Sequence, residues 1–199
     1  MNHVNALVIY CSQRIWLFLL CMLVAFGALA AVFMPLGRVF AELTGGAQMY
    51  DFQNALTVAE AIEQLPLYTG AARDVYYAFT FVDYFFPFFA GLFLAAIAAL
   101  SLRHLAPAAY AWITERRLWP LLLLGTLCDW TENLFALALI AGQPTDPVAL
   151  ATGLVLAKKA KLLFVMAAQL IGWSLLLLAA LRWMGQRLGL IRSRPGAPT

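Results

Sequence analysis

Charged residues are scarce in this chain. Asp, Glu, Lys and Arg make up 12% of its 199 residues, whereas hydrophobic residues make up 64%. A soluble domain ordinarily carries about 25% charged residues, and the charges here are also segregated, so that long stretches carry almost none. The composition excludes an ordinary soluble domain and predicts an integral membrane protein with a single domain.

Histidine and cysteine are nearly absent. The two histidines, His3 and His104, lie outside the apolar runs, and the three cysteines, Cys11, Cys21 and Cys128, have no redox spacing. This distribution disfavours a zinc or haem centre and disulfide exchange. We expect no cofactor and no metal with histidine or cysteine ligands, and a hard cation held by carboxylates alone stays an alternative.

Long apolar runs, in contrast, are plentiful. Each is long enough to supply the ~20 residues that cross a bilayer, and without β-barrel alternation only helices can span. The predicted spans are about 15–34, 75–102, 118–141 and 148–181. Pro35 is expected to close the first helix, and Asp146-Pro147 to begin the last one. The predicted fold class is an all-α integral membrane protein with four transmembrane helices in a bundle.

Arginines are divided unevenly between the two sides of this predicted bundle. Only Arg38 and Arg73 fall in loops on one side, and the other side carries Arg14, Arg103, Arg116, Arg117, Arg182, Arg187, Arg192 and Arg194. The positive-inside rule then places both termini in the cytoplasm and segments 35–74 and 142–147 outside. A bacterial inner membrane is the expected location.

The N-terminal run has a second interpretation. Arg14, the apolar stretch after it and Ala28-Leu29-Ala30 also fit a secretory signal with an Ala-x-Ala cleavage site. The apolar stretch is long for a signal, which favours an uncleaved helix.

The long external loop 35–74 contains a helix signature. Thr57-Val58-Ala59-Glu60 matches a capping box, and Val58, Ile62 and Leu65 then fall on one helical face before Pro66. We expect a short amphipathic helix here, either as a surface element or as a lid over a site.

Three carboxylates lie inside the apolar runs. An ionisable group at that depth costs roughly 2.5–3.5 kcal/mol even on lenient scales, so it marks a candidate functional site. At about 1.5 Å per residue, Asp83 and Glu132 fall at nearly the same level in the outer half of the bilayer. Asp129 and Asn133 share a face with Glu132. We predict Asp83, Asp129 and Glu132 as catalytic residues, with Asn133 orienting them.

Further polar groups accompany these acids. Thr80 and Tyr84 lie on the same helix edge as Asp83, and Trp130 adjoins the acids of the third span. Pro87, four residues after Asp83, predicts a kink and a carbonyl without its helical partner. Thr80, Tyr84 and Trp130 are therefore predicted to bind or orient a substrate.

Lysines of the fourth span provide the expected counter-charges. Lys158 and Lys161 lie one turn apart, and their long stems can reach inward to the acids, whereas Lys159 points elsewhere. Three acids at this depth cannot all stay ionised without cations. We predict that Lys161, or failing it Lys158, contacts the acids.

Two classes of function fit this pattern. The first is an intramembrane acid–base enzyme acting on a lipid or isoprenoid, with Glu132 and Asp83 as acid and base and Asp129 as the tuner of their protonation. The second is a non-enzymatic membrane protein, a small transporter or assembly partner, in which the same charges carry protons or hold helices in register. The expected partners are membrane lipids, a lipid-like or isoprenoid ligand and a second copy of the chain, with no nucleic acid.

Overall fold

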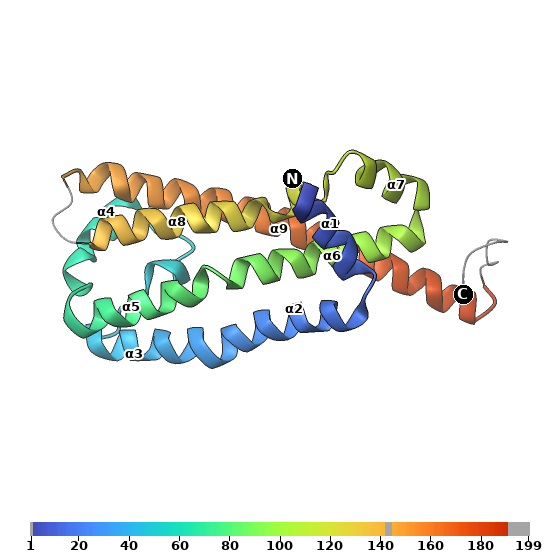
Figure 1. Cartoon of the computed structure of the whole chain (residues 1–199). Coiled ribbons are helices and arrows are strands. Elements are labelled where there is room, and N and C mark those ends of the chain that lie inside the picture. Colours follow the sequence, from blue (N-terminus) through green and yellow to red (C-terminus); the bar gives the residue numbers. More distant parts are fainter. Residues whose placement is uncertain (1, 142–144, 191–199) are drawn as a thin grey trace.

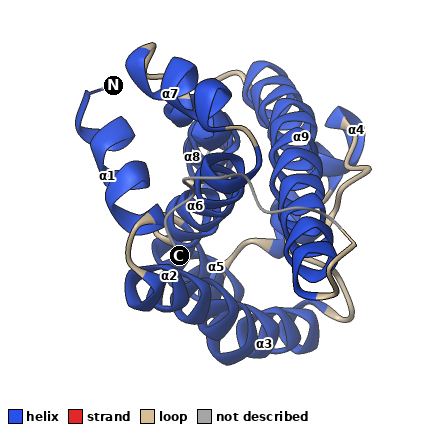
Figure 2. Ribbon diagram, turned by 90° about the vertical axis from the view of Figure 1, so that its right-hand side faces the viewer, coloured by secondary structure: helices blue, strands red, loops and turns tan. Residues whose placement is uncertain are grey.

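The computed structural model describes residues 2–141 and 145–190 (Figure 1). Within these ranges every regular element is a helix, as Figure 2 shows. Four helical stretches are long and apolar enough to cross a membrane: Trp16–Thr44, Gly70–Leu105, Trp119–Ile140 and Pro147–Arg187. They lie side by side as a bundle (Figure 1). The predicted fold class is confirmed.

The first spanning helix does not end at Pro35, so that prediction is wrong. α2 (Ile15–Ala28) continues through a π-helical turn, Leu29–Phe33, into α3 (Met34–Thr44). In the π turn the Met34 N–H donates to the Leu29 carbonyl, one residue further back than in an α-helix. The wider turn lets the helix pass a proline that has no N–H to donate. The helix stops at Gly45, which has a left-handed φ of 72°.

The second spanning helix is broken where Pro87 predicted a kink. α5 (Gly70–Asp83) and α6 (Phe86–Leu105) meet at two non-helical residues. α8 (Leu124–Ile140) satisfies carbonyls near the break: the Trp130 indole N–H donates to the Tyr84 carbonyl at 2.8 Å, and the Thr126 hydroxyl donates to the Pro87 carbonyl at 2.8 Å. The break is thereby tied to the helix that carries two of the predicted acids.

The last spanning helix begins as predicted. The Asp146 carboxylate accepts the Ala149 N–H at 2.9 Å, and α9 (Pro147–Arg187) follows. Its 41 residues measure about 62 Å, roughly twice the hydrocarbon thickness. Residue 142, which follows the predicted third span 118–141, lies outside the described residues.

α8 and α9 pack together more extensively than any other helix pair. Glycine allows this approach: a Cβ added to Gly125 would lie 2.7 Å from Val165 Cγ2. Close packing of these two helices brings the polar faces of both together.

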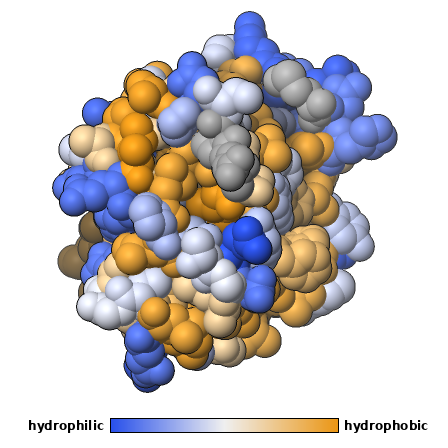
Figure 3. All heavy atoms as spheres, turned by 90° about the vertical axis from the view of Figure 1, so that its left-hand side faces the viewer, coloured by the Kyte–Doolittle hydropathy of each residue, from blue (hydrophilic) through white to orange (hydrophobic). Residues whose placement is uncertain are grey.

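Residues 45–69 fold back over one end of the bundle. α4 (Val58–Glu63) has the predicted capping box, with the Thr57 N–H donating to Glu60 Oε2 at 2.8 Å, and it packs against α9. Hydrogen bonds from Thr57 lower the pKa of the Glu60 carboxyl. The predicted amphipathic helix is confirmed. Figure 3 shows this end, where hydrophilic and hydrophobic residues are interspersed.

Tyrosines hold this segment in place. The Tyr50 and Tyr68 rings stack 4.4 Å apart, the Tyr50 N–H donates to the Tyr68 hydroxyl at 2.9 Å, and the Tyr50 hydroxyl donates to the Ala61 carbonyl at 2.6 Å. Burial raises the pKa of both phenols, so they stay neutral. The segment is a packed cap on the bundle.

Two helices were not predicted. α1 (Asn2–Ser12) and α7 (Pro107–Glu115) both pack against α6, and they lie at the same end of the bundle as the C-terminal turns of α9 (Figure 1). The same end carries Arg14, Arg103, Arg116, Arg117, Arg182 and Arg187. Arg192 and Arg194 lie outside the described residues. The assignment of this end to the cytoplasm stays a prediction.

Candidate functional site

A polar stripe on α8 faces the interior of the bundle. Asp129 is 5% exposed, and Glu132 and Asn133 are fully buried. Their spacing of three and four residues puts them on one face of the helix, as predicted. The rest of α8 is largely apolar, so burial of this face must be offset by partners on other helices.

Lysines of α9 supply those partners. Lys158 Nζ lies 2.5 Å from Glu132 Oε1, and Lys161 Nζ lies 2.5 Å from Glu132 Oε2 and 2.7 Å from Asp129 Oδ1. The prediction that these lysines reach the acids is confirmed, and Lys159 is exposed. Glu132 is thus the counterion of two ammonium groups at once.

Asp83 joins the cluster from the broken helix. The Asn133 amide donates to Asp83 Oδ2 at 2.9 Å, and more weakly to Asp129 Oδ2 at 3.5 Å. The Asn133 amide therefore brings together the carboxyl groups of Asp129 and of Asp83, which is the last residue of α5. The structure thus brings Asp83 beside Asp129, whereas within the described residues the contacts of Glu132 are with Lys158 and Lys161, so the expected approach of Asp83 to Glu132 stays a prediction.

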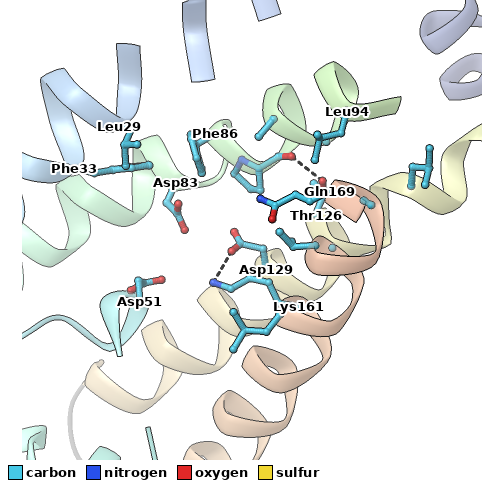
Figure 4. A pocket seen from close by; sticks show the side chains of 18 of the residues that line it. Leu29, Phe33, Asp51, Asp83, Phe86, Leu94, Thr126, Asp129, Lys161 and Gln169 are labelled. Atoms are coloured by element: carbon cyan, nitrogen blue, oxygen red, sulfur yellow. Dashed lines mark hydrogen bonds and ion pairs between the residues drawn. The ribbon is translucent and has the colours of Figure 1, made fainter. Parts of the chain in front are cut away.

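Asp51 is a fourth acid, and sequence reasoning missed it. It lies in the cap segment and faces Asp83, Asp129 and Lys161 (Figure 4). The Tyr76 hydroxyl donates to Asp51 Oδ2 at 2.8 Å. The one available signal was its position between Tyr50 and Phe52, an acid with large aromatic neighbours in a loop.

A cavity of about 290 Å³ adjoins these acids. Its polar end carries Asp51, Asp83, Asp129 and Lys161 (Figure 4). Most of the remaining wall is apolar, and includes Phe33, Phe79, Phe86, Ala90, Leu94, Leu122, Val165 and Ala168. The cavity can therefore hold an apolar group next to paired carboxyl groups.

The cavity reaches the outside of the bundle on one flank. Leu29 of the π turn and Gln169 of α9 both line it, and both are exposed. α6 packs against α2 and against α9, and the two outer helices stand on different sides of it (Figure 2). The cavity lining therefore reaches the outer surface of the bundle at Leu29 and at Gln169, on the surface that lipid would cover.

Some predicted site residues are not among those lining the cavity. Glu132, Asn133 and Lys158 lie behind its polar wall, in the ion-pair network. The Thr80 hydroxyl donates to the Tyr76 carbonyl at 2.9 Å, while Tyr84 and Trp130 border a shallow apolar depression elsewhere on the bundle. The structure therefore brings Asp83, Asp129 and Lys161 to the cavity, and does not bring Thr80, Tyr84 and Trp130 there.

The donor set does not resemble a metal centre. Among residues 2–141 and 145–190, no three His, Cys, Asp or Glu side chains are grouped as metal ligands. Lys161 contacts Asp129 and Glu132 where a cation would otherwise bind them.

The chain is a polytopic membrane protein with charged residues buried inside its helical bundle. None of the family models, curated proteins or solved structures compared with it matches. Its function must therefore be inferred from the chemistry of the site.

Proposed function

We propose that this protein is an intramembrane enzyme that performs acid–base chemistry on a lipid or isoprenoid substrate. The observation that carries the proposal is the Asp83–Asp129 pair, held by the Asn133 amide at the polar end of an otherwise apolar cavity. Two carboxyl groups in such a pair share one proton, which supplies an acid and a base in one place.

Their surroundings assign the two roles. Lys161 lies 2.7 Å from Asp129 and favours its ionised form, so Asp129 is the base. Within the described residues, the Asp83 side chain receives only a neutral amide hydrogen, so it is the group that carries the proton and serves as the acid. Glu132, expected to be the acid, is held by two lysines, and we assign it to positioning Lys161 beside Asp129.

The shape of the cavity supports a lipid-like substrate. A volume of about 290 Å³ accommodates the reacting end of a lipid but not a whole one. The rest of the chain would leave between Leu29 and Gln169 into the bilayer. Enclosure by apolar walls excludes water, which strengthens electrostatic interactions with the reacting group.

Transport through this site has less support. A proton or ion path needs polar groups toward both ends of the bundle. Apart from Thr126 and Gln169, however, the cavity wall away from the acids is apolar and includes Leu94, Leu122 and Ala168. The ion pair of Lys158 and Glu132 also joins α8 to α9. We therefore retain one part of the non-enzymatic hypothesis, namely that buried charges hold these helices in register.

Lipid mass spectrometry on membranes and purified protein tests the proposal. Asp83→Asn and Asp129→Asn should each cause the same lipid species to accumulate relative to the native chain. Asp74→Asn is the matched control, because Asp74 is an exposed acid on the same helix as Asp83. Folded Asp83→Asn and Asp129→Asn proteins with the native lipid profile would overturn the enzyme assignment.

A further inference from the structure

The charges around the cavity do not balance within the described residues. Four carboxyl groups meet here, Asp51, Asp83, Asp129 and Glu132, against two ammonium groups, so one negative charge stays in excess when Asp83 carries its proton. Both lysines are committed to Glu132 and Asp129. In the part of the chain that the structure describes, the side chains of Asp51 and Asp83 receive hydrogen bonds only from the Tyr76 hydroxyl and the Asn133 amide, which are neutral.

Each of these two acids has an oxygen left over. Tyr76 binds Asp51 Oδ2, and Asp51 Oδ1 is buried without a hydrogen-bond partner. Asp83 is 6% exposed, and the one side-chain hydrogen bond to it within the described ranges goes to Oδ2. Both carboxylates point into the cavity (Figure 4). A buried carboxylate oxygen without a donor is costly, so a donor from a ligand would stabilise it.

Aromatic rings line the wall beside these acids. Phe33 lies 4.8 Å from Phe79 and 5.0 Å from Phe86, and Phe52 lies 5.4 Å from Phe79, measured between ring centroids. All four rings border the cavity. Ring faces attract cations, and their combination with carboxylates is how proteins recognise alkylammonium groups.

We infer that the cavity binds an amphiphile whose head carries a positively charged nitrogen, placed between Asp51 and Asp83 against the phenylalanine rings. The inference rests on the proposed function, because it names the substrate class of the same site. A single alkyl chain then extends along Leu162 and Val165 to the outer surface at Leu29 and Gln169.

An ammonium head would supply both the hydrogen-bond donors that Asp51 and Asp83 lack among the described residues and the positive charge that the cavity lacks. Its N–H groups can donate to Asp51 Oδ1 and to the open oxygen of Asp83, and its charge offsets the one negative charge that remains in excess. A neutral alcohol head supplies one weak donor and no charge. A carboxylate head would be repelled by the acids.

Equilibrium binding to the purified full chain in a neutral maltoside detergent tests this. The probe is dodecylamine, which is protonated at pH 7, and dodecanol and dodecanoate are the chain-matched controls. Dodecylamine should bind saturably and about tenfold or more tightly than dodecanol, because a hydrogen bond to a charged group contributes roughly that factor. Equal affinity for dodecylamine and dodecanol would overturn the inference.

Variants locate the head. Asp51→Asn and Asp83→Asn should each weaken dodecylamine binding about tenfold and leave dodecanol binding almost unchanged. Glu63→Gln, at an exposed acid of the cap, should change neither. Ala90→Leu, which fills the apolar wall without touching the acids, should weaken binding of both probes. Native dodecylamine affinity in both aspartate variants would contradict the inference, and a melting curve for each variant verifies its fold.

This assay is independent of turnover. Selective dodecylamine binding together with an unchanged lipid profile in Asp83→Asn membranes would sustain the inference and end the enzyme proposal. A changed lipid profile without selective dodecylamine binding would sustain the enzyme proposal and overturn the inference about the ligand.

Discussion

Glu132→Gln should destabilise the protein more than any other single change in the ionic network. Glu132 is fully buried, and each of its oxygens lies 2.5 Å from a lysine nitrogen. At an effective dielectric constant of ~20, each contact is worth about 7 kcal/mol of Coulomb energy, most of which offsets desolvation. Removal of one partner of a buried pair nevertheless costs about 3–5 kcal/mol, because the other charge is left buried.

The cost falls mainly on Lys158. Lys161 keeps Asp129 at 2.7 Å, whereas among the described residues Lys158 keeps only the Asp51 carbonyl, at 3.5 Å. Lys158→Met alone should therefore cost less than Glu132→Gln, since Glu132 still has Lys161. The double variant should be more stable than the sum of the two single losses predicts, by about 1–3 kcal/mol.

Unfolding in detergent, followed by tryptophan fluorescence, measures all three variants. Lys159→Met is the control, because Lys159 is the exposed neighbour of Lys158 and should have almost no effect. Strictly additive losses, or a Glu132→Gln loss below about 1 kcal/mol, would refute the argument that Glu132 is a buried shared counterion.

Three further predictions concern other parts of the chain. The folded-state pKa of Glu60 is lowered from its ordinary value of 4.5 by Thr57, so Glu60→Gln should destabilise the cap at pH 7. This difference should close as the pH falls through the folded-state pKa, and a pH series of melting temperatures for the native chain and Glu60→Gln checks it. Gly125→Ala should cost about 1–3 kcal/mol by pushing against Val165, and Val165→Ala should restore part of the loss; unfolding midpoints of the single and double variants would show this. Gln48→Cys, at an exposed position of the cap, should react with a membrane-impermeant maleimide added outside intact cells, and reaction only after permeabilisation would reverse the proposed orientation.

The sequence by itself determined where the spanning helices lie and which side chains share a face on each helix. Backbone groups in hydrocarbon must be satisfied within the segment, so a long apolar run has to be helical. Residues three and four apart share a helical face, which is why the stripe of Asp129, Glu132 and Asn133 could be predicted. The same reasoning correctly pointed Lys158 and Lys161 inward and Lys159 outward.

Prediction from local sequence failed at Pro35 and at two short helices. Pro35 predicts a helix end because it lacks an N–H, but the π turn at Leu29–Phe33 changes the hydrogen-bond register and the helix continues. α1 and α7 are short and lie outside the spans, so the search for long apolar runs passed over them.

The composition of the site was decided by tertiary structure. Asp51 lies in a segment without helical periodicity, so nothing in the sequence states which way it points. It reaches Asp83 because the stack of Tyr50 on Tyr68 and the hydrogen bond from Tyr76 fold the cap inward. Likewise, the sequence put three acids in the bundle, but only the rotation of α5, α8 and α9 about one another decides which carboxylates meet lysines and which face the cavity. That rotation depends on close packing at places such as Gly125 and Val165, a property of helix pairs that no single segment contains.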